Sequence, residues 1–511
     1  MMFNKLKDMN KKFIFGCLSV LAMSFAMTSC SDDDNGGNNG NYNWSTDGGL
    51  RACDHILFSN GKENEQGTEI GNGDQEFVFT GNQTLKKGTY LLKGWVYIAD
   101  GAVLTIEPGT VIKGDKDTKA ALIVERGGKL YAQGTSTDPI VFTSEQAKGN
   151  RRPGDWGGVI LCGKAVNNQE EMQIEGGPRT KHGGSNNADN SGVLSYVRIE
   201  FAGYPFQPDK EINGLTLGSV GSGTKIDHVQ VSYSNDDSFE WFGGTVDAKY
   251  LISYKGWDDD FDTDNGFSGR VQFGLTVRDS KIADKSLSNG FESDNCADGS
   301  AVSPYTTAQF SNITFVGPKL DASFQNNVDY ITAGSMNPNN GSALGLYQSA
   351  MQIRRNSRLN CFNSIAVGYP VGLILDNEKG NTQGAATGNL LKLQNIWFAG
   401  MDILGADANK SFSDHLVTGY EDSEPVYDNS KPSFSSTFFL AQTGNRNLTD
   451  MSDMQMNDNG YMPMSGSPVL TAASFSGMNN WFTNVSYIGA FNAGDTWAEG
   501  WTNFDPENTD Y

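Results

Sequence analysis

The most chemically dense stretch of the chain is WDDDFDTDNGFSGR, residues 257–270. Five of the seven positions from Asp258 to Asp264 are aspartates. Carboxylates at this density can bind a divalent cation, supply the acid and base of a catalytic site, or form a solvated surface. The elements that surround the run decide between these roles.

Two other segments repeat its pattern of an aromatic residue followed by a carboxylate. They are NDDSFEWFGG (235–244) and SNGFESDN (288–295), and the three pairs are Phe239–Glu240, Phe261–Asp262 and Phe291–Glu292. The first two phenylalanines are 22 residues apart, and the third follows 30 residues later. If the segments occupy successive coils of a repeating fold, the rings stack inside and the carboxylates form a column outside.

A column of like charges at the strand spacing of ~4.8 Å needs a neutralising partner. Ca²⁺, which takes six to eight oxygen ligands, fits this pattern. The candidate metal ligands are Asp258, Asp260, Asp262, Asp264, Glu240 and Glu292. Gly266 lies one position too late for an EF-hand, so the site would be a loop site of another kind. The alternative is a solvated rim that Lys255, Arg270 and Lys281 screen.

Aromatic residues near the ends of expected strands suggest ligand binding. Flat rings can stack on sugar faces while carboxylates accept hydrogen bonds from hydroxyl groups. The candidate ligand-binding residues are Asp236, Asp237, Trp241, Trp257, Tyr204 and Phe206, with Tyr254 and Tyr369 as further exposed rings. For each ring the alternative is stacking inside the fold.

Short apolar strands flanked by glycine, proline, aspartate or asparagine must position these residues. Val103, Leu122, Val141 and Ile160 head four such strands and are each 19 residues apart. A period near 20 residues without a helical pattern predicts a β-solenoid, and 61 glycines with only 15 prolines agree with many turns and paired strands. We therefore expect an all-β parallel β-helix over 81–400, an N-terminal cap over 44–80 and a C-terminal capping region over 401–511.

The N-terminal residues predict export. A lysine-rich start and the apolar run 13–27, too short to span a bilayer, indicate a signal peptide over 1–29. MTSC (27–30) resembles a bacterial lipobox, which implies acylation of Cys30, and 30–43 has the composition of a flexible acidic tether. We expect a lipid anchor in the outer membrane with the chain exposed at the cell surface; a periplasm-facing lipoprotein is the alternative.

The charge and the cysteines exclude other classes. A net charge of −22 argues against nucleic acid as a partner, because such binding needs clustered lysine and arginine. The cysteines are widely separated and form no CxxC pair, which excludes the usual zinc modules. Cys162 and Cys361 lie in strand-like runs, so we expect them to be buried.

Several segments together resemble a large family of Bacteroidota surface and secreted proteins. They include VLTIEPGTVIKG, GDWGGVILCGKA, INGLTLGSVGSGTKIDHVQVSYSNDDSFEWFGG and VSYIGAFNAGDTWAEGWTNFDP. The resemblance covers nearly the whole mature chain. It implies a right-handed parallel β-helix of the pectate-lyase-like superfold and implies no reaction.

A catalytic interpretation is nevertheless open, because parallel β-helices include lyases that use Ca²⁺ with a basic residue and hydrolases that use paired carboxylates. Asp236–Asp237 and Arg354–Arg355 could supply such groups, but the Gly-His-Gly and Arg-Ile-Lys segments of polygalacturonase-like enzymes are absent. We assign no catalytic residue. We expect a non-catalytic scaffold that binds a ligand or partner, in glycan capture or in service of an outer-membrane uptake system. A polysaccharide lyase or glycoside hydrolase, and an adhesive surface protein, are the alternatives.

Overall fold

The structure is a computed structural model that describes residues 68–169, 171–174, 176–207, 210–334, 336 and 343–511. The predicted signal peptide, the acylated Cys30, the tether and most of the predicted N-terminal cap lie outside these residues.

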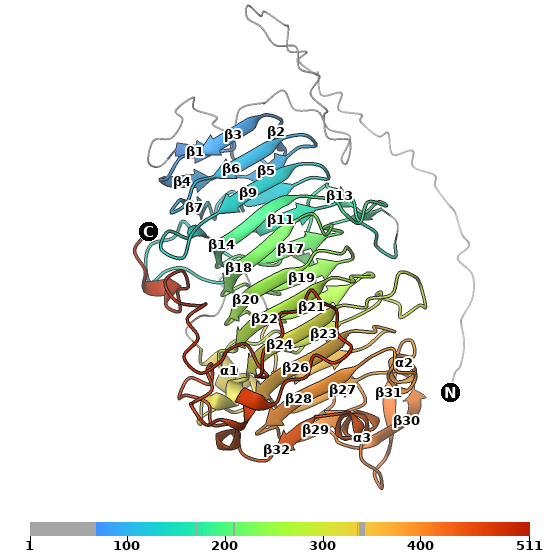
Figure 1. Ribbon diagram of the computed structural model, residues 1–511. Coiled ribbons are helices and arrows are strands. Elements are labelled where there is room, and N and C mark those ends of the chain that lie inside the picture. The colour runs from blue at the N-terminus through green and yellow to red at the C-terminus, as the bar shows by residue number, and fades with distance from the viewer. Residues whose placement is uncertain (1–67, 170, 175, 208–209, 335, 337–342) are drawn as a thin grey trace, which may run out of the picture. The chain divides into compact units, whose positions relative to one another are not determined.

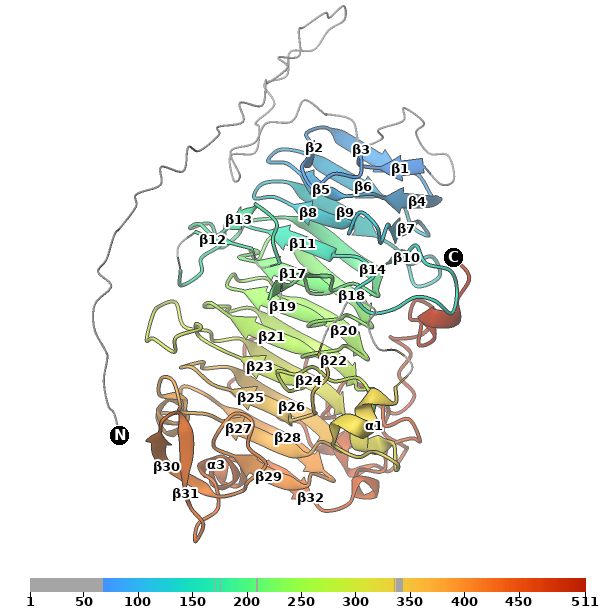
Figure 2. The same ribbon diagram turned by 180° about the vertical axis from the view of Figure 1, so that it is seen from behind.

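The described residues form two long parallel sheets whose strands stack in sequence order (Figures 1 and 2). The first sheet contains β1 (Thr68–Ile70), β3 (Asn82–Leu85), β4 (Thr89–Leu92), β6 (Val103–Ile106), β7 (Val111–Gly114), β9 (Lys129–Gln133), β10 (Ile140–Ser144), β14 (Gly192–Glu200), β18 (Lys225–Ser232), β20 (Ala248–Tyr254), β22 (Arg270–Val277), β24 (Gln309–Val316), β26 (Asn360–Val367), β28 (Leu393–Ala399) and β32 (Arg446–Leu448). The second contains β2 (Phe77–Phe79), β5 (Trp95–Ile98), β8 (Ala121–Val124), β11 (Gly158–Cys162), β17 (Leu215–Gly218), β19 (Phe239–Phe242), β21 (Phe261–Asp264), β23 (Phe291–Ser293), β25 (Ser349–Ile353), β27 (Val371–Leu375) and β29 (Ile403–Ala406). This arrangement confirms the predicted all-β parallel β-helix.

Smaller elements project from the coils. They are the antiparallel pairs β12 (Met172–Gln173) with β13 (Lys181–His182), β15 (Pro205–Gln207) with β16 (Lys210–Glu211) and β30 (Leu416–Glu421) with β31 (Glu424–Asp428), the helices α1 (Val328–Thr332), α2 (Thr382–Thr387) and α3 (Phe434–Ala441), and the short 3₁₀ turns η1 (Pro318–Leu320), η2 (Met451–Met454), η3 (Pro468–Thr471) and η4 (Pro506–Asn508). None of the helices in the described part of the chain is long and apolar enough to cross a membrane.

The coil is longer than the 19-residue spacing suggested. Val96 of β5 pairs with Leu122 of β8, and Phe239 of β19 pairs with Phe261 of β21. The residues spaced by 19 instead alternate between the two sheets: Val103 and Val141 belong to the first, Leu122 and Ile160 to the second. The 19-residue spacing therefore connects strands of different sheets and is not the length of a coil, which takes 22 to 26 residues in these two pairs. Parallel pairing runs from Thr68 to Leu448, beyond both ends of the predicted 81–400.

The long strands of the first sheet bend at one residue each. β14 pairs with β9 before Tyr196 and with β10 after it, and Tyr196 itself has a positive φ of 52°. His228, Tyr250 and Phe273 occupy the same position in the next three strands, with φ between 51° and 64°. For a residue other than glycine, a backbone in this left-handed conformation costs free energy. Here the rings of the four residues stack on one another, with centroids 4.3, 4.4 and 5.1 Å apart.

The space between the sheets is filled by apolar side chains. Phe239, Phe261 and Phe291 are fully buried and stack at 5.6 and 5.9 Å, as the repeated motif predicts. Cys162 and Cys361 are buried free thiols, which confirms their expected role as apolar fillers.

The C-terminal region has two parts. α3 packs against β27 and β29 near the last coils, with Phe439 stacked on Phe398. The ending 481–511, which belongs to the predicted capping region 401–511, does not cover the last coil but runs back along the first sheet, so that the C-terminal end lies beside β7 and β10 (Figures 1 and 2). Polar side chains of the sheet hold it: Gln272 donates to the carbonyl of Thr483 and Gln230 to that of Asn503.

Candidate cation-binding cleft

The predicted carboxylate column exists in the second sheet. Glu240, Asp262 and Glu292 are register partners in β19, β21 and β23. They point away from the phenylalanines because side chains alternate along a strand. Thr216 precedes them in the ladder and Gln352 follows.

A second column lies in the turns that lead into these strands. Asp237 accepts a hydrogen bond from the backbone N–H of Asp259 at 2.9 Å, and Asp259 accepts one from that of Asn289 at 2.5 Å. Each carboxylate thus accepts a hydrogen bond from a backbone N–H group of the following coil. This ladder fixes Asp237 beside the outward column.

The two columns bring five carboxylates together. One ligand oxygen from each of Asp236, Asp237 and Asp258 lies within 4.8 Å of the others, and the same holds for Asp237, Glu240 and Asp262. Two oxygens bound to one Ca²⁺ at about 2.4 Å are at most about 4.8 Å apart, so each group fits a shared calcium ion. We call these five residues the acidic cluster; Asp237 belongs to both groups.

Two oxygens of the acidic cluster lack a partner among the described residues. Oδ1 of Asp258 and Oδ1 of Asp262 are buried, and neither accepts a hydrogen bond from a described residue. Asp237 and Glu240 are each only 7% exposed, and Asn213 donates to Glu240. Buried carboxylate oxygens without a donor are costly. A bound cation would satisfy them.

Burial and the repulsion of neighbouring carboxylates raise the pKa values of three members of the cluster, Asp237, Asp258 and Asp262. Burial, then the charges of Asp236 and Glu240, hold the pKa of Asp237 well above its usual value. Burial and the charges of Glu240 and Glu292 do the same for the pKa of Asp262. A cation would favour the charged forms and reverse these shifts.

Basic residues stand at the edge of the acidic cluster. Arg354 pairs with Glu292 and, at 3.0 Å, with Asp294, and Arg355 contacts Asp294 at 2.6 Å. Among the described residues, no lysine or arginine lies within ion-pair distance of Asp237, Asp258 or Asp262. The acidic cluster, Glu292, Arg354 and Arg355 line two adjoining cavities of about 460 and 260 Å³. Asp284, Lys285, Asn409 and Lys410 also contribute to the lining. We call this recess the acidic cleft.

The three residues expected to screen the acids do not reach them. Lys255 pairs with Asp279, Arg270 pairs with Asp247, and Lys281 lies over the ring of Tyr330. The interpretation of a rim screened by these three cations is therefore wrong. The arginines that do approach the acids follow β25, three coils after the first acidic segment.

Two of the predicted metal ligands lie elsewhere. Asp260 faces the interior, where it forms a fully buried ion pair with Arg278 at 3.1 Å and accepts a hydrogen bond from Ser253. It therefore cannot join the acidic cluster. Asp264 is on the outer face at the far end of β21, where burial and the charge of Asp294 raise its pKa to about 7. Glu292 lines the cleft but is paired with Arg354.

The predicted aromatic platform is not present in the cleft. Trp241 and Trp257 are 0% exposed, because Trp241 follows Phe239 on the inner face and Trp257 packs in a second core cluster. Tyr254 and Tyr369 are buried as well. Tyr204 and Phe206 are partly exposed, but they pack with each other and Phe206 with Trp95, outside the acidic cleft. Of the predicted ligand-binding residues, only Asp236 and Asp237 line it.

Sequence reasoning missed Asp284, Lys285 and Lys410 as lining residues. Asp284 and Lys285 lie in the insertion that separates the second and third phenylalanine by 30 residues, so the longer spacing was the available signal. Nothing near Lys410 resembles the acidic motifs.

Comparison with known families agrees with the observed architecture. A family model described as a pectate-lyase-like β-helix domain matches residues 77–502. No curated protein sequence and no solved structure is significantly similar to the chain.

Proposed function

The chain belongs to the pectate-lyase-like β-helix domain family, and we propose that its acidic cleft binds Ca²⁺ and, through the ion, captures an oxygen-rich ligand without transforming it. The observation that carries the proposal is the acidic cluster: two groups of three carboxylates that share Asp237, each within the distance that one ion can bridge, and two of the five residues have a buried oxygen that no described residue satisfies. Calcium suits the site because it accepts many carboxylate oxygens in irregular geometry.

The ligand would bind beside the ion. A Ca²⁺ ion held in part by the cluster keeps coordination positions for hydroxyl or carboxylate oxygens of a glycan. Arg354, Arg355 and Lys410 line the same recess and can donate hydrogen bonds to such a ligand. The protein would then act as a glycan-capturing scaffold.

We further propose that the chain is a Bacteroidota lipoprotein, acylated at Cys30, anchored in the outer membrane and displayed at the cell surface beside an uptake system. The motif MTSC and the acidic tether support this placement. Metabolic labelling with palmitate tests it: label should enter the wild-type chain and be absent from Cys30→Ala. Protease digestion of intact cells should then degrade the protein; a protected chain would contradict surface display.

A glycan array probed at 1 mM Ca²⁺ and in EDTA tests the cleft. Binding of at least one glycan should require calcium, and this calcium-dependent signal should be lost in Asp237→Asn. It should persist in Asp458→Asn, which removes the same charge from an exposed position. The proposal is contradicted if no glycan on the array shows binding that depends on both calcium and Asp237.

One observation favours an enzyme as a second candidate. Burial raises the pKa values of Asp237, Asp258 and Asp262, which is the direction that a carboxyl acting as a general acid requires. Incubation with the glycans that bind decides: release of unsaturated or reducing ends would establish a lyase or hydrolase, whereas capture without product supports the scaffold.

A further inference from the structure

A second recess lies on the other sheet, away from the acidic cleft. It is a groove of about 570 Å³ between β14, β18 and β20 on one side and Trp481 of the returning C-terminal segment on the other. Pockets of this size accommodate small organic ligands. We call it the Trp481 groove.

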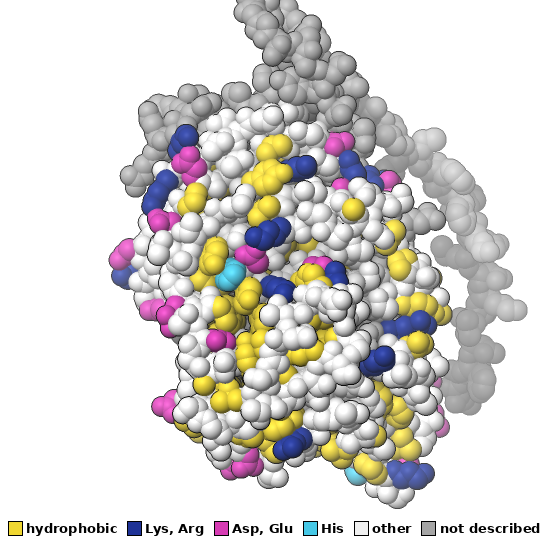
Figure 3. Space-filling view, viewed as in Figure 1, with side chains coloured by type: hydrophobic (Ala, Val, Ile, Leu, Met, Phe, Trp, Pro, Cys, Tyr) yellow, Lys and Arg dark blue, Asp and Glu magenta, His cyan; other side chains and the backbone are white. Residues whose placement is uncertain are grey.

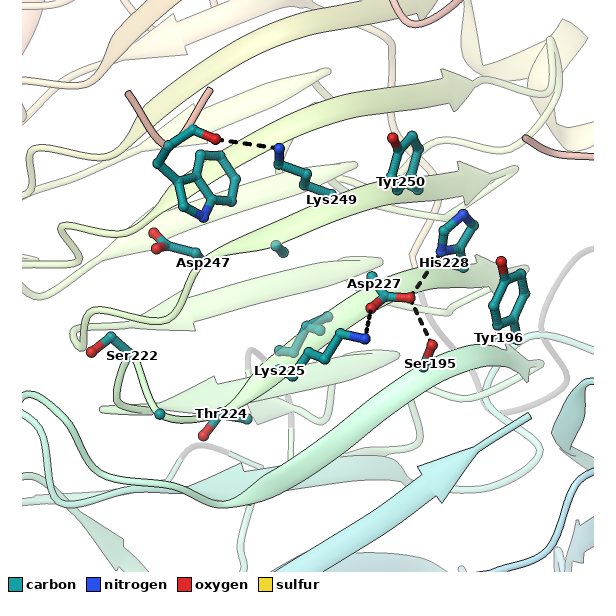
Figure 4. A pocket seen from close by; sticks show the side chains of 14 residues that line it. Ser195, Tyr196, Ser222, Thr224, Lys225, Asp227, His228, Asp247, Lys249 and Tyr250 are labelled. Carbon is teal, nitrogen blue, oxygen red and sulfur yellow. Dashed lines mark hydrogen bonds and ion pairs between the residues drawn. The ribbon is translucent and has the colours of Figure 1, made fainter. Parts of the chain in front are cut away.

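Its floor is a row of polar side chains in register. Ser195, Asp227 and Lys249 are partners in the three strands. Asp227 accepts hydrogen bonds from Ser195 at 2.6 Å and from His228 at 2.8 Å, and pairs with Lys225 at 2.8 Å (Figure 4). Burial alone would raise the pKa of Asp227, but the hydrogen bonds from His228, Lys225 and Ser195 lower it to about 2. The groove thus contains a fixed, ionised acceptor.

A column of rings borders this row. Tyr196, His228 and Tyr250 stack at the bends of the same strands, and Figure 4 shows them aligned beside Asp227. Trp497 and Trp501 of the returning segment pack against one side of this column, and the three rings also line the groove. Among the described residues, none forms a hydrogen bond with the phenol oxygens of Tyr196 or Tyr250.

The opposite wall is an aromatic ring in a fixed position. Lys249 donates to the carbonyl of Trp481 at 3.3 Å and lies 4.6 Å from its ring centroid, and Arg270 lies 5.1 Å away. The indole is only partly buried. A flat ring opposite hydrogen-bonding groups is the arrangement that recognises one face and the hydroxyls of a sugar.

The charges of the groove balance. Both carboxylates of the groove are already paired with a cation, Asp227 with Lys225 and Asp247 with Arg270. Acidic and basic side chains are likewise interspersed on the face shown in Figure 3. This balance favours neither a metal ion nor an anionic ligand, in contrast to the acidic cleft.

We propose that the Trp481 groove is a second, cation-independent binding site for a neutral saccharide, with Trp481 as the stacking surface and Asp227, Lys225 and the polar ring edges as hydrogen-bond partners. The site is independent of calcium binding in the acidic cleft. It would let one chain contact a glycan at two separate places.

Histidine ring NMR of the purified protein tests this proposal without a mutation. The chain has four histidines, of which His228 borders the groove and His182 is fully buried and serves as an internal reference. The probes are the methyl glycosides of glucose, galactose and mannose, cellobiose, and free galacturonate, all in EDTA. At least one neutral sugar should shift the His228 signals saturably and leave those of His182 unchanged.

Variants then locate the binding. Trp481→Ala should raise the Kd of that sugar about tenfold or more. Phe412→Ala, which removes an exposed ring outside the groove, should leave it unchanged. The proposal is overturned if no neutral sugar shifts His228, if only galacturonate does, or if the affinity is the same in Trp481→Ala. A requirement for calcium would also overturn it, and would assign the binding to the acidic cleft.

Discussion

Replacing Asp262 by asparagine should stabilise the calcium-free protein and weaken its response to calcium. Asp262 lies within 4.8 Å of ligand oxygens of both Asp237 and Glu240. Two unit charges at that distance repel by about 3.5 kcal/mol at an effective dielectric constant of about 20. A carboxyl takes up a proton when the repulsion on its charge exceeds the free energy of protonation. For an ordinary pKa of 3.8, that free energy is about 4.4 kcal/mol at pH 7, which sets the upper limit of the destabilisation from one carboxyl.

We therefore expect Asp262→Asn to raise the free energy of unfolding by about 3 kcal/mol in EDTA at pH 7. For a β-helix spanning residues 77–502, the unfolding entropy is about 0.9 kcal/mol/K, so the melting temperature should rise by about 3 °C. Differential scanning calorimetry measures this directly. Asp458→Asn makes the same change in net charge at an exposed position and should leave the melting temperature unchanged.

Calcium should stabilise the wild type more than it stabilises Asp262→Asn. An ion at 100 times its Kd stabilises the wild type by about 2.7 kcal/mol, or roughly 3 °C. Removing one charged ligand and weakening binding tenfold would halve this gain to about 1.4 kcal/mol. The reasoning is refuted if Asp262→Asn destabilises the protein in EDTA, or if calcium stabilises the variant as much as the wild type.

Three further outcomes follow from the same structure. In EDTA, the free energy of unfolding should fall as the pH rises from 6.5 to 8. The raised pKa values, with that of Asp264 at about 7, make the folded state hold more protons than the unfolded state. Calorimetric scans measure this slope, and saturating calcium should flatten it. Below pH 6.5 buried His182, with a pKa lowered to about 3, opposes this trend, so a rise in stability between 6.5 and 8 in EDTA would be the contradictory result. Arg278→Met should lower the free energy of unfolding in urea by about 3–5 kcal/mol, because it leaves the buried Asp260 without its cation. Adding Asp260→Asn should recover part of this loss. An unchanged urea midpoint would show that the pair is not buried. Trp241→Phe should lower stability by about 1–3 kcal/mol yet leave the glycan-array signal intact, because the ring is in the core; selective loss of binding would restore its predicted role as a ligand contact.

The repeated motif predicted the architecture and the column because it reports a local regularity. Phe239, Phe261 and Phe291 recur with carboxylates one position later, and strand alternation turns that order into an inner stack and an outer ladder. The same alternation places Trp241 inside, since it follows Phe239 by two residues. The expectation that Trp241 was exposed therefore conflicted with the register that the motif itself implied.

The remaining features depend on contacts between distant coils. Asp260 was grouped with its neighbours in sequence, but the turn directs it inward to Arg278, which no local pattern indicates. Arg354 reaches Glu292 across 62 residues because β25 stacks next to β23. The path of residues 481–511 along the first sheet likewise depends on contacts between residues far apart in sequence, such as the two hydrogen bonds between Gln272 and Thr483, and composition carries no signal for them.

Equilibrium dialysis of the EDTA-stripped protein against radioactive calcium is the most direct test of the acidic cleft. At pH 7.5 the wild type should bind calcium saturably, and the affinity should fall at least tenfold in Asp237→Asn, the residue shared by both carboxylate groups, but not in Asp458→Asn. Absence of saturable binding by the wild type, or equal binding by Asp237→Asn, would contradict the assignment of the cleft as a calcium site.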